Sequence, residues 1–408
     1  MALIPLEDVR REILDTVEPL APIDWPSRDA LGLALAAAVA TAEAVPPFAN
    51  TAMDGYAVRA ADTAGAGPGA GVRLRVVGEL PAGHPPTVPV GAGEAIRIMT
   101  GAPVPEGADA IVMVERTRRD GDDGVVVEHE ASIGDHVRPA GGDLQAGQRA
   151  FPAGTVLRPA HVGLLASIGV STVQVHPRPR VGVLSTGDEL VESGPLTPGQ
   201  IRDSNRPMLL ALLRDADVEP VDLGIARDDE AHIVATLEDA FARCDAVITS
   251  GGVSVGDYDY VKAALDRFGA LEWRQVAIKP AKPLAFGVVE GTPVFGLPGN
   301  PVSSLVSFEL FARPALLQMM GHPYRFRPEV LARAEHDFRR RPDGKLHLDR
   351  VRVRWSGEGY VASSTGAQES NVLSATAAAN GLALVPDGDG IPEGAPLTVM
   401  LLDAPADH

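Results

Sequence analysis

Small residues and carboxylates come together in one stretch of this sequence, residues 244–259, which reads CDAVITSGGVSVGDYD. The apolar run at 246–249 is typical of a buried parallel strand. Ser250, Gly251 and Gly252 end that run, and glycine lets a ligand approach the backbone closely. Ligands of open α/β sheets bind where parallel strands end, so this loop is a candidate binding site.

Asp257 and Asp259 follow the glycines and precede a helical pattern at 260–268. Free backbone amides and a helix start favour an anion, whereas carboxylates favour a cation. A phosphate ligand held through Mg²⁺ would satisfy both kinds of group. The stretch therefore predicts a strand, a loop and a helix around a magnesium–phosphate site.

Two more loops follow predicted strands, STGDE at 185–189 and GLPGNP at 296–301. Loops at the same edge of one sheet can share a crevice, so Asp188 and Glu189 would join the two acids named above. Carboxylates clustered in this way usually hold a divalent metal or titrate abnormally. The alternative is that each acid lies at a helix start, where the helix dipole stabilises it.

Two lysines, Lys279 and Lys282, each precede a proline in the segment IKPAKP. Proline restricts the residue before it to extended geometry, which makes the segment stiff. Two ammonium groups on a stiff backbone are suited to contact a phosphate or another oxyanion. The alternative is that both lysines are solvated at the surface.

Three further motifs are weak when each is taken alone. Asp54 precedes a glycine in MDGYA, which is typical of a β-turn. Thr100 opens the turn-rich TGAP, and GAQESN at 366–371 fits a heteroaromatic ligand or a plain loop. The sequence has no GxxxxGK[ST], no GxGxxG after a strand, no GxSxG and no HExxH, so a P-loop ATPase or a Rossmann dehydrogenase is poorly supported.

Composition limits the class of protein. The 408 residues are 45% hydrophobic and carry a net charge of −18, so we expect several apolar cores and neither nucleic acid nor a membrane surface as a partner. Cys244 is the single cysteine, which excludes an internal disulfide and a cysteine-based zinc site. No signal peptide or membrane-spanning run is visible, so we expect a cytoplasmic protein.

The first half of the chain combines two helical patterns with β-like runs between them. The helices are expected at 6–17 and 159–168, and the strands at 72–77, 95–99, 110–114 and 125–128. The economical arrangement packs the two helices together. Residues 1–44 and 140–177 then form a discontinuous elongated domain, and 45–139 an inserted β domain. We expect 138–156 to be a loop with one hairpin, and 29–44 to be helical or extended.

Strands and helices alternate over 178–324, which predicts a doubly wound α/β domain. Its strands are expected at 181–185, 221–225, 246–249, 284–289 and 292–295, the last two as a pair. Its helices are expected at 206–215, 229–242, 260–268 and 302–319, with Asn205 as the N-cap of the first. The pattern of residues 325–408 is again typical of β-strands, which are expected at 327–337, 346–355, 359–362, 382–386 and 396–402.

Taken together, these motifs resemble the molybdopterin molybdenumtransferase (MoeA) family, to which the E domain of gephyrin is related. The motifs occur in family order: PPFANTAMDGYAVR (46–59), RIMTGAPVPEGADAIV (97–112), STGDEL (185–190), DSNRPML (203–209), TSGGVSVGDYDYVK (249–262), KPAKPLAFG (279–287) and GLPGNPVSS (296–304). A set that spans most of the chain is far more specific than any single motif. It implies a central molybdopterin-binding-like α/β domain, an inserted β domain, a discontinuous N-terminal domain and a C-terminal β barrel.

The resemblance also implies a reaction. Molybdate is inserted into adenylylated molybdopterin in a Mg²⁺-dependent step that releases AMP and molybdenum cofactor. We hypothesise that molybdate provides the attacking oxygen while Mg²⁺ and lysines neutralise charge. The family implies a homodimer in which the β domain of one subunit faces the α/β domain of the other. Molybdopterin adenylyltransferase and molybdoenzyme acceptors are further expected partners.

Site roles carry over to the residues that match the family motifs. The expected catalytic residues are Asp54, Thr100, Glu189, Asp259, Lys279 and Lys282. The expected cofactor-binding residues are Ser250, Gly251, Gly252, Asp228, Pro298, Pro301, Arg350 and Ser370. The expected metal ligands are Glu189, Asp257 and Asp259. Asp54 and Thr100 would complete the cleft from across the dimer.

Two residues depart from the family pattern. Ala281 stands where relatives often have glycine, and Gly142 stands where a glutamate is expected. If residue 281 needs a positive φ, alanine is strained there. Two alternative functions stay open: the preceding adenylyltransferase step and a gephyrin-like scaffold. The additional domains and MDGYA argue against the first, and the lack of an appended partner domain argues against the second.

Overall fold

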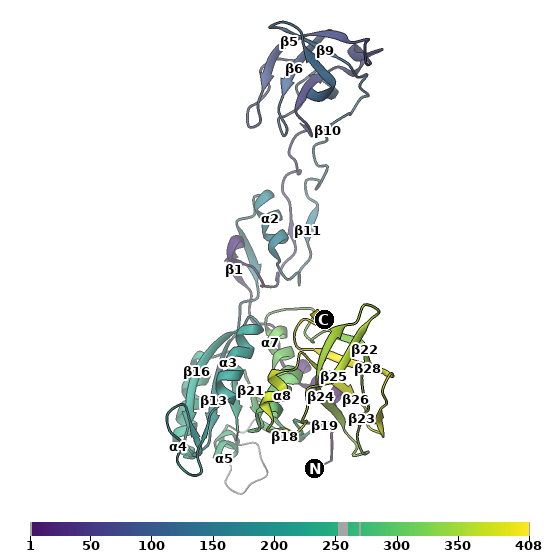
Figure 1. The fold of residues 1–408 in the computed structure, drawn as a ribbon. Helices are drawn as coiled ribbons and strands as arrows, with labels where there is room; N and C mark the ends of the chain where they lie inside the picture. Colours follow the sequence, from purple (N-terminus) through teal and green to yellow (C-terminus); the bar gives the residue numbers. More distant parts are fainter. Residues whose placement is uncertain (1, 252–259, 269–270, 408) are drawn as a thin grey trace.

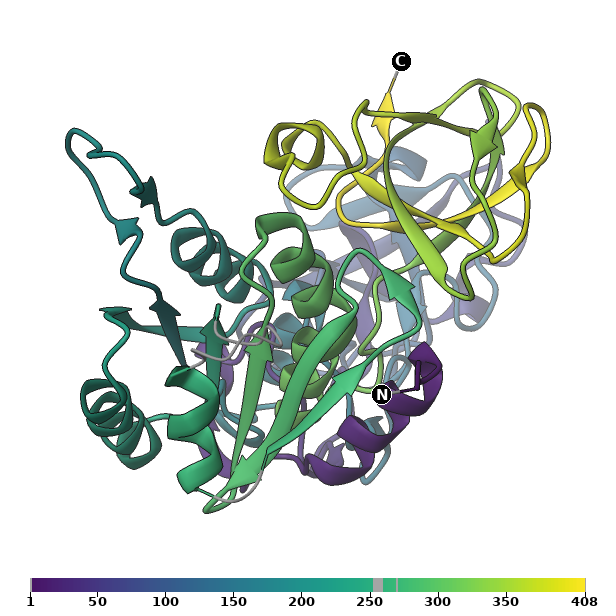
Figure 2. The same ribbon diagram turned by 90° about the horizontal axis from the view of Figure 1, so that it is seen from below.

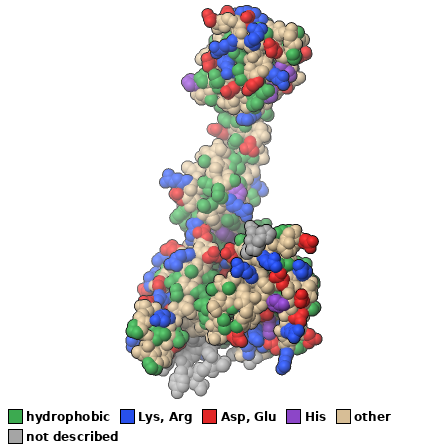
Figure 3. Space-filling view, in the orientation of Figure 1, with side chains coloured by type: hydrophobic (Ala, Val, Ile, Leu, Met, Phe, Trp, Pro, Cys, Tyr) green, Lys and Arg blue, Asp and Glu red, His purple; other side chains and the backbone are tan. Residues whose placement is uncertain are grey.

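The computed structural model describes residues 2–251, 260–268 and 271–407. Figure 1 shows an elongated molecule with a β domain at one end and a broad base at the other, and Figure 3 shows the narrower part between them. The base holds an α/β domain and a C-terminal barrel, which lie next to one another in Figure 2. The predicted multidomain architecture is confirmed.

A six-stranded sheet forms the centre of the α/β domain. Its strands, in spatial order, are β16 (Glu219–Ala226), β13 (Arg180–Thr186), β17 (Ala246–Ser250), β21 (Thr292–Leu297), β20 (Pro283–Val289) and β18 (Leu271–Gln275). The first four strands pair in parallel, whereas β20 pairs antiparallel with both of its neighbours, β21 and β18. Apolar runs predicted five of these strands and the pairing of β20 with β21, but not β18.

Helices cover both faces of this sheet. Alternate strand residues point to opposite faces: Val247 packs beneath α4 (Glu230–Arg243) and α5 (Tyr260–Arg267), and Ile248 packs on the other side. That other side is covered by α1 (Leu6–Thr16), α3 (Asn205–Asp215), α6 (Pro301–Ser307) and α7 (Arg313–Met319). Among the described residues, no helix has the length and apolarity needed to cross a membrane.

The helix predicted at 302–319 is interrupted between α6 and α7 by a π-helix, Phe308–Ala312. Pro314 explains the interruption, because it has no N–H to donate and its ring would clash with the carbonyl of Leu310. The Leu310 oxygen instead accepts a bond of 3.4 Å from Arg10 Nε on α1. The prediction of one uniform helix was therefore wrong.

The N-terminal helix also packs differently from the prediction. Val9 and Ile13 of α1 join the core of the α/β domain, whereas Leu165 of α2 (Pro159–Ser167) packs on Leu33 and Leu157 in the middle of the molecule. The predicted pairing of these two helices is wrong, because the apolar face of α1 is buried by the larger core.

The chain enters and leaves the β domain through an antiparallel ribbon. β2 (Val39–Ala40) pairs with β11 (Arg149–Phe151), and β3 (Asn50–Thr51) pairs with β10 (Val137–Arg138). Closer to the base, β1 (Ile23–Pro26) pairs with β12 (Thr172–Val175). The hairpin predicted within 138–156 is wrong, because β10 and β11 do not pair with each other: β10 pairs with β3 and β11 pairs with β2. Residues 29–44 are extended or turn rather than α-helical.

The inserted domain is built on another six-stranded sheet. In spatial order its strands are β7 (Ala110–Met113), β4 (Gly55–Val58), β6 (Glu94–Ile98), β5 (Val72–Leu80), β9 (Gly124–Val127) and β8 (Thr117–Arg119). The four predicted strands are present, and β4 and β8 are additional. Along β4, Tyr56 and Ala57 enter separate apolar clusters, so the sheet is packed on both faces.

A closed barrel forms the last domain. Its order is β24 (Leu346–Trp355), β25 (Tyr360–Ser364), β22 (Glu329–Ala334), β28 (Pro396–Leu401) and β26 (Gly381–Val385), closed by pairing of β26 with β24. All five strands were predicted, whereas α8 (Leu373–Ala377) was not. The short strand β19 (Ile278–Lys279) pairs with β24, so the lysine–proline segment is attached to the barrel.

Ala281 has φ +72° between the two lysine–proline pairs, and it is 2% exposed. The positive φ expected if alanine replaces a glycine is therefore present. A left-handed conformation costs an L-residue about 1–2 kcal/mol, which the surrounding core must offset.

We predict opposite outcomes for two substitutions at this position. Ala281→Gly changes the free energy of unfolding by less than about 1 kcal/mol, because strain relief offsets lost burial and higher unfolded-state entropy. Ala281→Val lowers it by about 2–4 kcal/mol, since overpacking adds to the cost of a branched residue at positive φ. Ala285→Val is the matched control, because Ala285 is a fully buried alanine on β20 without a positive φ. Denaturation midpoints measure all three, and equal losses for the two valine variants would contradict the strain.

Candidate active site

Three loops meet at the carboxyl edge of β13, β17 and β21, as the sequence predicted. Gly251 has φ +97°, and a Cβ there would lie 2.9 Å from the backbone oxygen of Thr186. A Cβ on Gly299 would lie 3.7 Å from the Cα of Gly251. The amide of Gly251 also donates to the Leu297 oxygen at 3.1 Å. Glycine at position 251 is what allows this close backbone approach.

Ser250 ends β17 and is only 2% exposed. Its Oγ accepts a 2.8 Å bond from Nδ2 of Asn205, and the same Nδ2 donates to the Gly299 oxygen at 2.7 Å. The prediction of Asn205 as an N-cap is wrong. The Asp203 carboxylate instead accepts from the amides of Asn205 and Arg206, at 3.1 Å each. The sequence signal for Asn205 was its place in DSNRPML, between two strand-end loops.

Exposed carboxylates surround this edge. Asp188 and Asp228 are linked by two hydrogen bonds. The Asp228 carboxylate accepts from the backbone amide of Asp188 at 3.4 Å, and the Asp188 carboxylate accepts from the backbone amide of Asp228 at 3.2 Å. The Glu189 carboxylate lies against Gly187, where an added Cβ would be 2.7 Å from Oε1. Three predicted residues, Gly252, Asp257 and Asp259, lie outside the described residues. Within the described ranges, no group of three or more His, Cys, Asp or Glu side chains is arranged to hold a metal ion.

A cavity of about 480 Å³ opens where the lysine–proline segment meets the barrel. Lys279 and Arg350 both line it, so the structure brings these two predicted residues together. Its other charged side chains are Arg339, Arg340, Arg341, Asp343, Asp349 and Glu369, and His347 lines it as well. Cationic groups outnumber carboxylates, although the whole chain is strongly acidic. Lys282 is exposed nearby in sequence but is not part of the lining.

Arg350 is fully buried on β24. Its Nη2 donates to the oxygens of Ala367 and Glu369 at 3.2 Å each, whereas Nε and Nη1 have no partner among the described residues. Burial lowers the pKa of this guanidinium and raises the pKa of the neighbouring Asp349 carboxyl. A buried cation with two unused donors is a candidate oxyanion ligand.

The sheet edge and the cavity are joined by hydrogen bonds. Asn300 Nδ2 donates to Ser370 Oγ at 2.9 Å, and the amide of Val302 donates to the Ser370 oxygen at 3.2 Å. Ser370 follows Glu369, whose oxygen holds Arg350. Pro298 is buried in the loop after β21, and Pro301 begins α6. The structure thus links the predicted residues of the α/β domain to those of the barrel.

Asp54 and Thr100 lie together but in the β domain. Asp54 Oδ1 accepts from both the hydroxyl and the amide of Thr100, at 2.6 Å and 2.7 Å. The hydroxyl bond, then the amide bond, lowers the pKa of Asp54 below its ordinary value. Figure 1 shows α2 and the ribbon between this domain and the base. Within one chain, this pair is therefore separate from the remaining predicted site residues.

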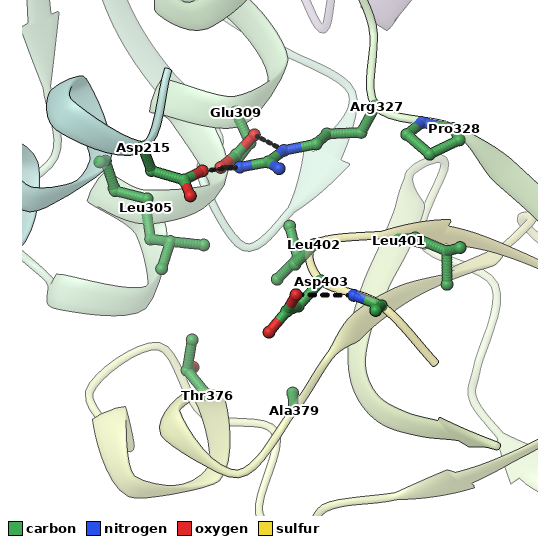
Figure 4. A pocket seen from close by; sticks show the side chains of 12 residues that line it. Asp215, Leu305, Glu309, Arg327, Pro328, Thr376, Ala379, Leu401, Leu402 and Asp403 are labelled. Atoms are coloured by element: carbon green, nitrogen blue, oxygen red, sulfur yellow. Dashed lines mark hydrogen bonds and ion pairs between the residues drawn. The ribbon is translucent and has the colours of Figure 1, made fainter. Parts of the chain in front are cut away.

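A second cavity, of about 540 Å³, lies between α3, the π-helix and the barrel (Figure 4). Its polar centre is Arg327, which bonds Glu309 through two nitrogens at 3.0 Å and Asp215 at 2.7 Å. None of the predicted site residues within the described ranges lines it. Its ion pairs connect the α/β domain to the strand that enters the barrel.

Three family models match successive parts of the chain. They are described as the MoeA N-terminal region (domain I and II), matching residues 4–169, a probable molybdopterin binding domain, matching 182–318, and the MoeA C-terminal region (domain IV), matching 332–402. Together they account for most of the chain.

Similar whole proteins are also known. Molybdopterin molybdenumtransferase 2 of Mycobacterium tuberculosis is 41% identical over 392 residues, which are 94% of this chain and 95% of the relative. The molybdopterin molybdenumtransferase of Haemophilus influenzae is 38% identical over 338 residues, 82% of each chain. A crystal structure of the molybdopterin biosynthesis MoeA protein from Pyrococcus horikosii aligns with TM-score 0.82 and 31% identity, covering 99% of this chain and 100% of that one. The similarity extends over the complete fold.

We predict that Thr100→Val raises the pKa of Asp54 toward its ordinary value, because the hydroxyl bond is the main cause of the lowered pKa. Since a lowered pKa favours the carboxylate, wild-type Asp54 stays ionised to lower pH than the variant. Thr100→Ser keeps both donors and should keep the low pKa. NMR titration of the Asp54 carboxyl carbon measures these values, and an unchanged midpoint in Thr100→Val would refute the assignment.

Proposed function

The chain belongs to the molybdopterin molybdenumtransferase family, and we propose that it inserts molybdate into adenylylated molybdopterin, releasing AMP and molybdenum cofactor. Its substrate would then come from a molybdopterin adenylyltransferase and its product would go to molybdoenzymes. The observation that carries this proposal is the fully buried Arg350, two of whose donors have no partner among the described residues, in a cavity that it shares with Lys279.

The proposal requires a place for oxyanions in an acidic protein. The chain carries a net charge of −18, so an unguided phosphate or molybdate would be repelled. The lining of Lys279, Arg350 and the arginines at 339–341 makes the potential locally positive. The Nε and Nη1 donors of Arg350 suit a tetrahedral oxyanion, because such an acceptor offers several oxygens to a guanidinium.

We propose that the acidic side of the sheet edge contributes carboxylates to a magnesium site, which the described side chains do not form by themselves. Asp188, Asp228 and Glu189 are exposed carboxylates, the oxygen donors that this ion prefers, and the first two are held close by their reciprocal amide bonds. When bound, Mg²⁺ would neutralise charge on the phosphate oxygens of the substrate. We propose Asp257 and Asp259, which follow β17 in the sequence and lie outside the described residues, as further ligands.

The described side chains then have distinct roles. The Ser250 hydroxyl and the backbone around Gly251 would contact the adenylate phosphate, since both lie at the carboxyl edge of the sheet. Lys279, Lys282 and Arg350 would hold molybdate and the developing charge. Cleavage of a phosphoanhydride needs positioning and charge neutralisation, so no covalent nucleophile from the protein is required.

We further propose that a second copy of the chain completes the site. Asp54 and Thr100 lie on the β domain, beyond the ribbon from Lys279 and Ser250 (Figure 1). An antiparallel arrangement of two elongated chains would bring the β domain of one against the α/β domain of the other. The homodimer would therefore carry two equivalent sites, each built from both chains.

We predict AMP release from adenylylated molybdopterin that depends on both molybdate and Mg²⁺. Lys279→Met should slow it by about 10²–10³-fold, the size found when one charge-stabilising donor is removed from an active site. Lys345→Met is the comparison variant: Lys345 does not line the cavity but pairs with Asp343, which does, so a much smaller loss there shows that the effect is specific to Lys279 and not to any lost positive charge nearby. Chromatographic quantification of AMP measures the rates.

Two results would count against the proposal. AMP release that is unaffected by molybdate would exclude the insertion step. Adenylylation of molybdopterin with ATP, without molybdate-dependent release, would favour the preceding reaction of the pathway.

We also predict complementation between inactive variants. Mixed dimers of Asp54→Ala and Lys279→Met chains contain one doubly defective site and one intact site. Random mixing should restore about a quarter of wild-type activity, because about half of the dimers are mixed and each has one working site. Co-expression with two different tags, followed by purification of the mixed dimer, tests this, and the purified mixed dimer should reach about half of wild-type activity because one of its two sites is intact. Absence of recovery in a verified mixed dimer would show that the site is not shared.

A further inference from the structure

Asn205 makes the contacts of a residue that organises the site. It is 8% exposed at the start of α3, and its Nδ2 bonds Ser250 Oγ at 2.8 Å and the Gly299 oxygen at 2.7 Å. We propose that Asn205 is a positioning residue that orients the Ser250 hydroxyl toward an anionic ligand and holds the loop after β21 beside it. The proposal deepens the proposed function and rests on it for the identity of the ligand.

The orientation of the Asn205 amide is determined by its neighbours. The Gly299 carbonyl can only accept a hydrogen bond, so the side chain must present Nδ2 rather than Oδ1 to it. Its backbone is fixed as well, because the Asp203 carboxylate accepts from the Asn205 amide at 3.1 Å and from the Ser185 hydroxyl at 3.1 Å. Asn205 is therefore tied to the ends of β13, β17 and β21 at once.

The polarity of the bond to Ser250 has a chemical consequence. A hydroxyl has one proton to donate and two lone pairs that accept. Because Asn205 occupies a lone pair of Ser250 Oγ as the donor, the serine proton must point away from the amide. An oxyanion at the sheet edge could then receive that proton as a hydrogen bond, and it would gain a donor of fixed direction.

The oxygen end of the Asn205 amide makes no contribution to the hydrogen bonding of the described part of the fold. Oδ1 is buried without a hydrogen-bond partner among the described residues. A buried asparagine that serves stability alone would be expected to use both ends of its amide. The side chain uses instead the end that reaches Ser250 and Gly299, which supports a role in aligning these two groups.

Asn205→Asp tests this with almost no change of shape. The carboxylate has no donor, so the bond to Ser250 must reverse and the Gly299 oxygen meets an anion. We expect the affinity for AMP with Mg²⁺, measured by calorimetry, to fall by roughly 10- to 100-fold, as for two lost hydrogen bonds. Ser250→Ala should also weaken AMP binding. The double variant should be no weaker than the weaker-binding single variant, within about twofold, because both changes remove the same alignment.

Asn380→Asp provides the matched control. Asn380 also holds backbone groups through Nδ2, the Val353 oxygen at 2.9 Å and the Ala404 oxygen at 3.3 Å, but it lies in the barrel. It should lower stability without changing AMP affinity. If the losses of Asn205→Asp and Ser250→Ala multiply in the double variant, or if Asn205→Asp leaves AMP affinity unchanged, the positioning role is overturned.

A measurement without ligand separates this inference from the proposed function. Hydrogen exchange of the Gly251 amide, bonded to the Leu297 oxygen, should become about tenfold faster in Asn205→Asp and stay unchanged in Asn380→Asp. Unchanged exchange in Asn205→Asp would overturn the inference even if wild-type protein releases AMP. If wild-type protein fails to release AMP, the proposed function fails, while faster exchange in the variant would still support the positioning of this loop.

Discussion

The close backbone contact at the carboxyl edge of β13, β17 and β21 is the constraint on which the rest of the site depends. Gly251 can approach Thr186 only because it has no Cβ, and its φ of +97° is one that residues with a side chain rarely adopt. Parallel strands with buried faces hold these loops in register, and Asn205 crosses between two of them. The loops themselves can stay polar and open to a ligand because the sheet beneath them is rigidly packed.

The second constraint is electrostatic. An acidic chain needs a region where cationic groups outnumber carboxylates if it is to bind anions, and in this chain the cavity at the barrel is such a region. The exposed carboxylates follow β13 and β16, whereas Lys279 and Arg350 lie where β19 pairs with β24. The burial of Arg350 keeps its guanidinium from water and from most counter-charges, which strengthens any interaction it makes with an oxyanion. The hydrogen bonds through Asn300 and Ser370 hold these two regions together.

The elongated shape of the chain separates a third group of residues, those on the β domain, from the sheet edge and from the cavity at the barrel. The ribbon that carries the β domain is formed by the two ends of an insertion, so its strands are distant in sequence but adjacent in space. Asp54 and Thr100 form a local pair whose geometry is complete without any other domain. Such a pair is suited to act on a neighbouring molecule, because it needs no rearrangement within its own chain.

The sequence by itself determined where the strands and helices with strong apolar periodicity lie. It also divided the chain into four regions by their helical or β-strand patterns and identified the loops that could bind a ligand. The resemblance to the family also identified Ala281 as a position of strain, since relatives often have glycine there, and its φ of +72° bears this out. Only the tertiary structure decided how distant segments pair. The ribbon, the packing of α1 on the α/β core and the burial of Arg350 all depend on contacts between residues far apart in sequence, which local patterns do not encode. Asn205 illustrates the difference: its type fitted a helix cap, but the positions of Ser250 and Gly299 gave its amide two other partners.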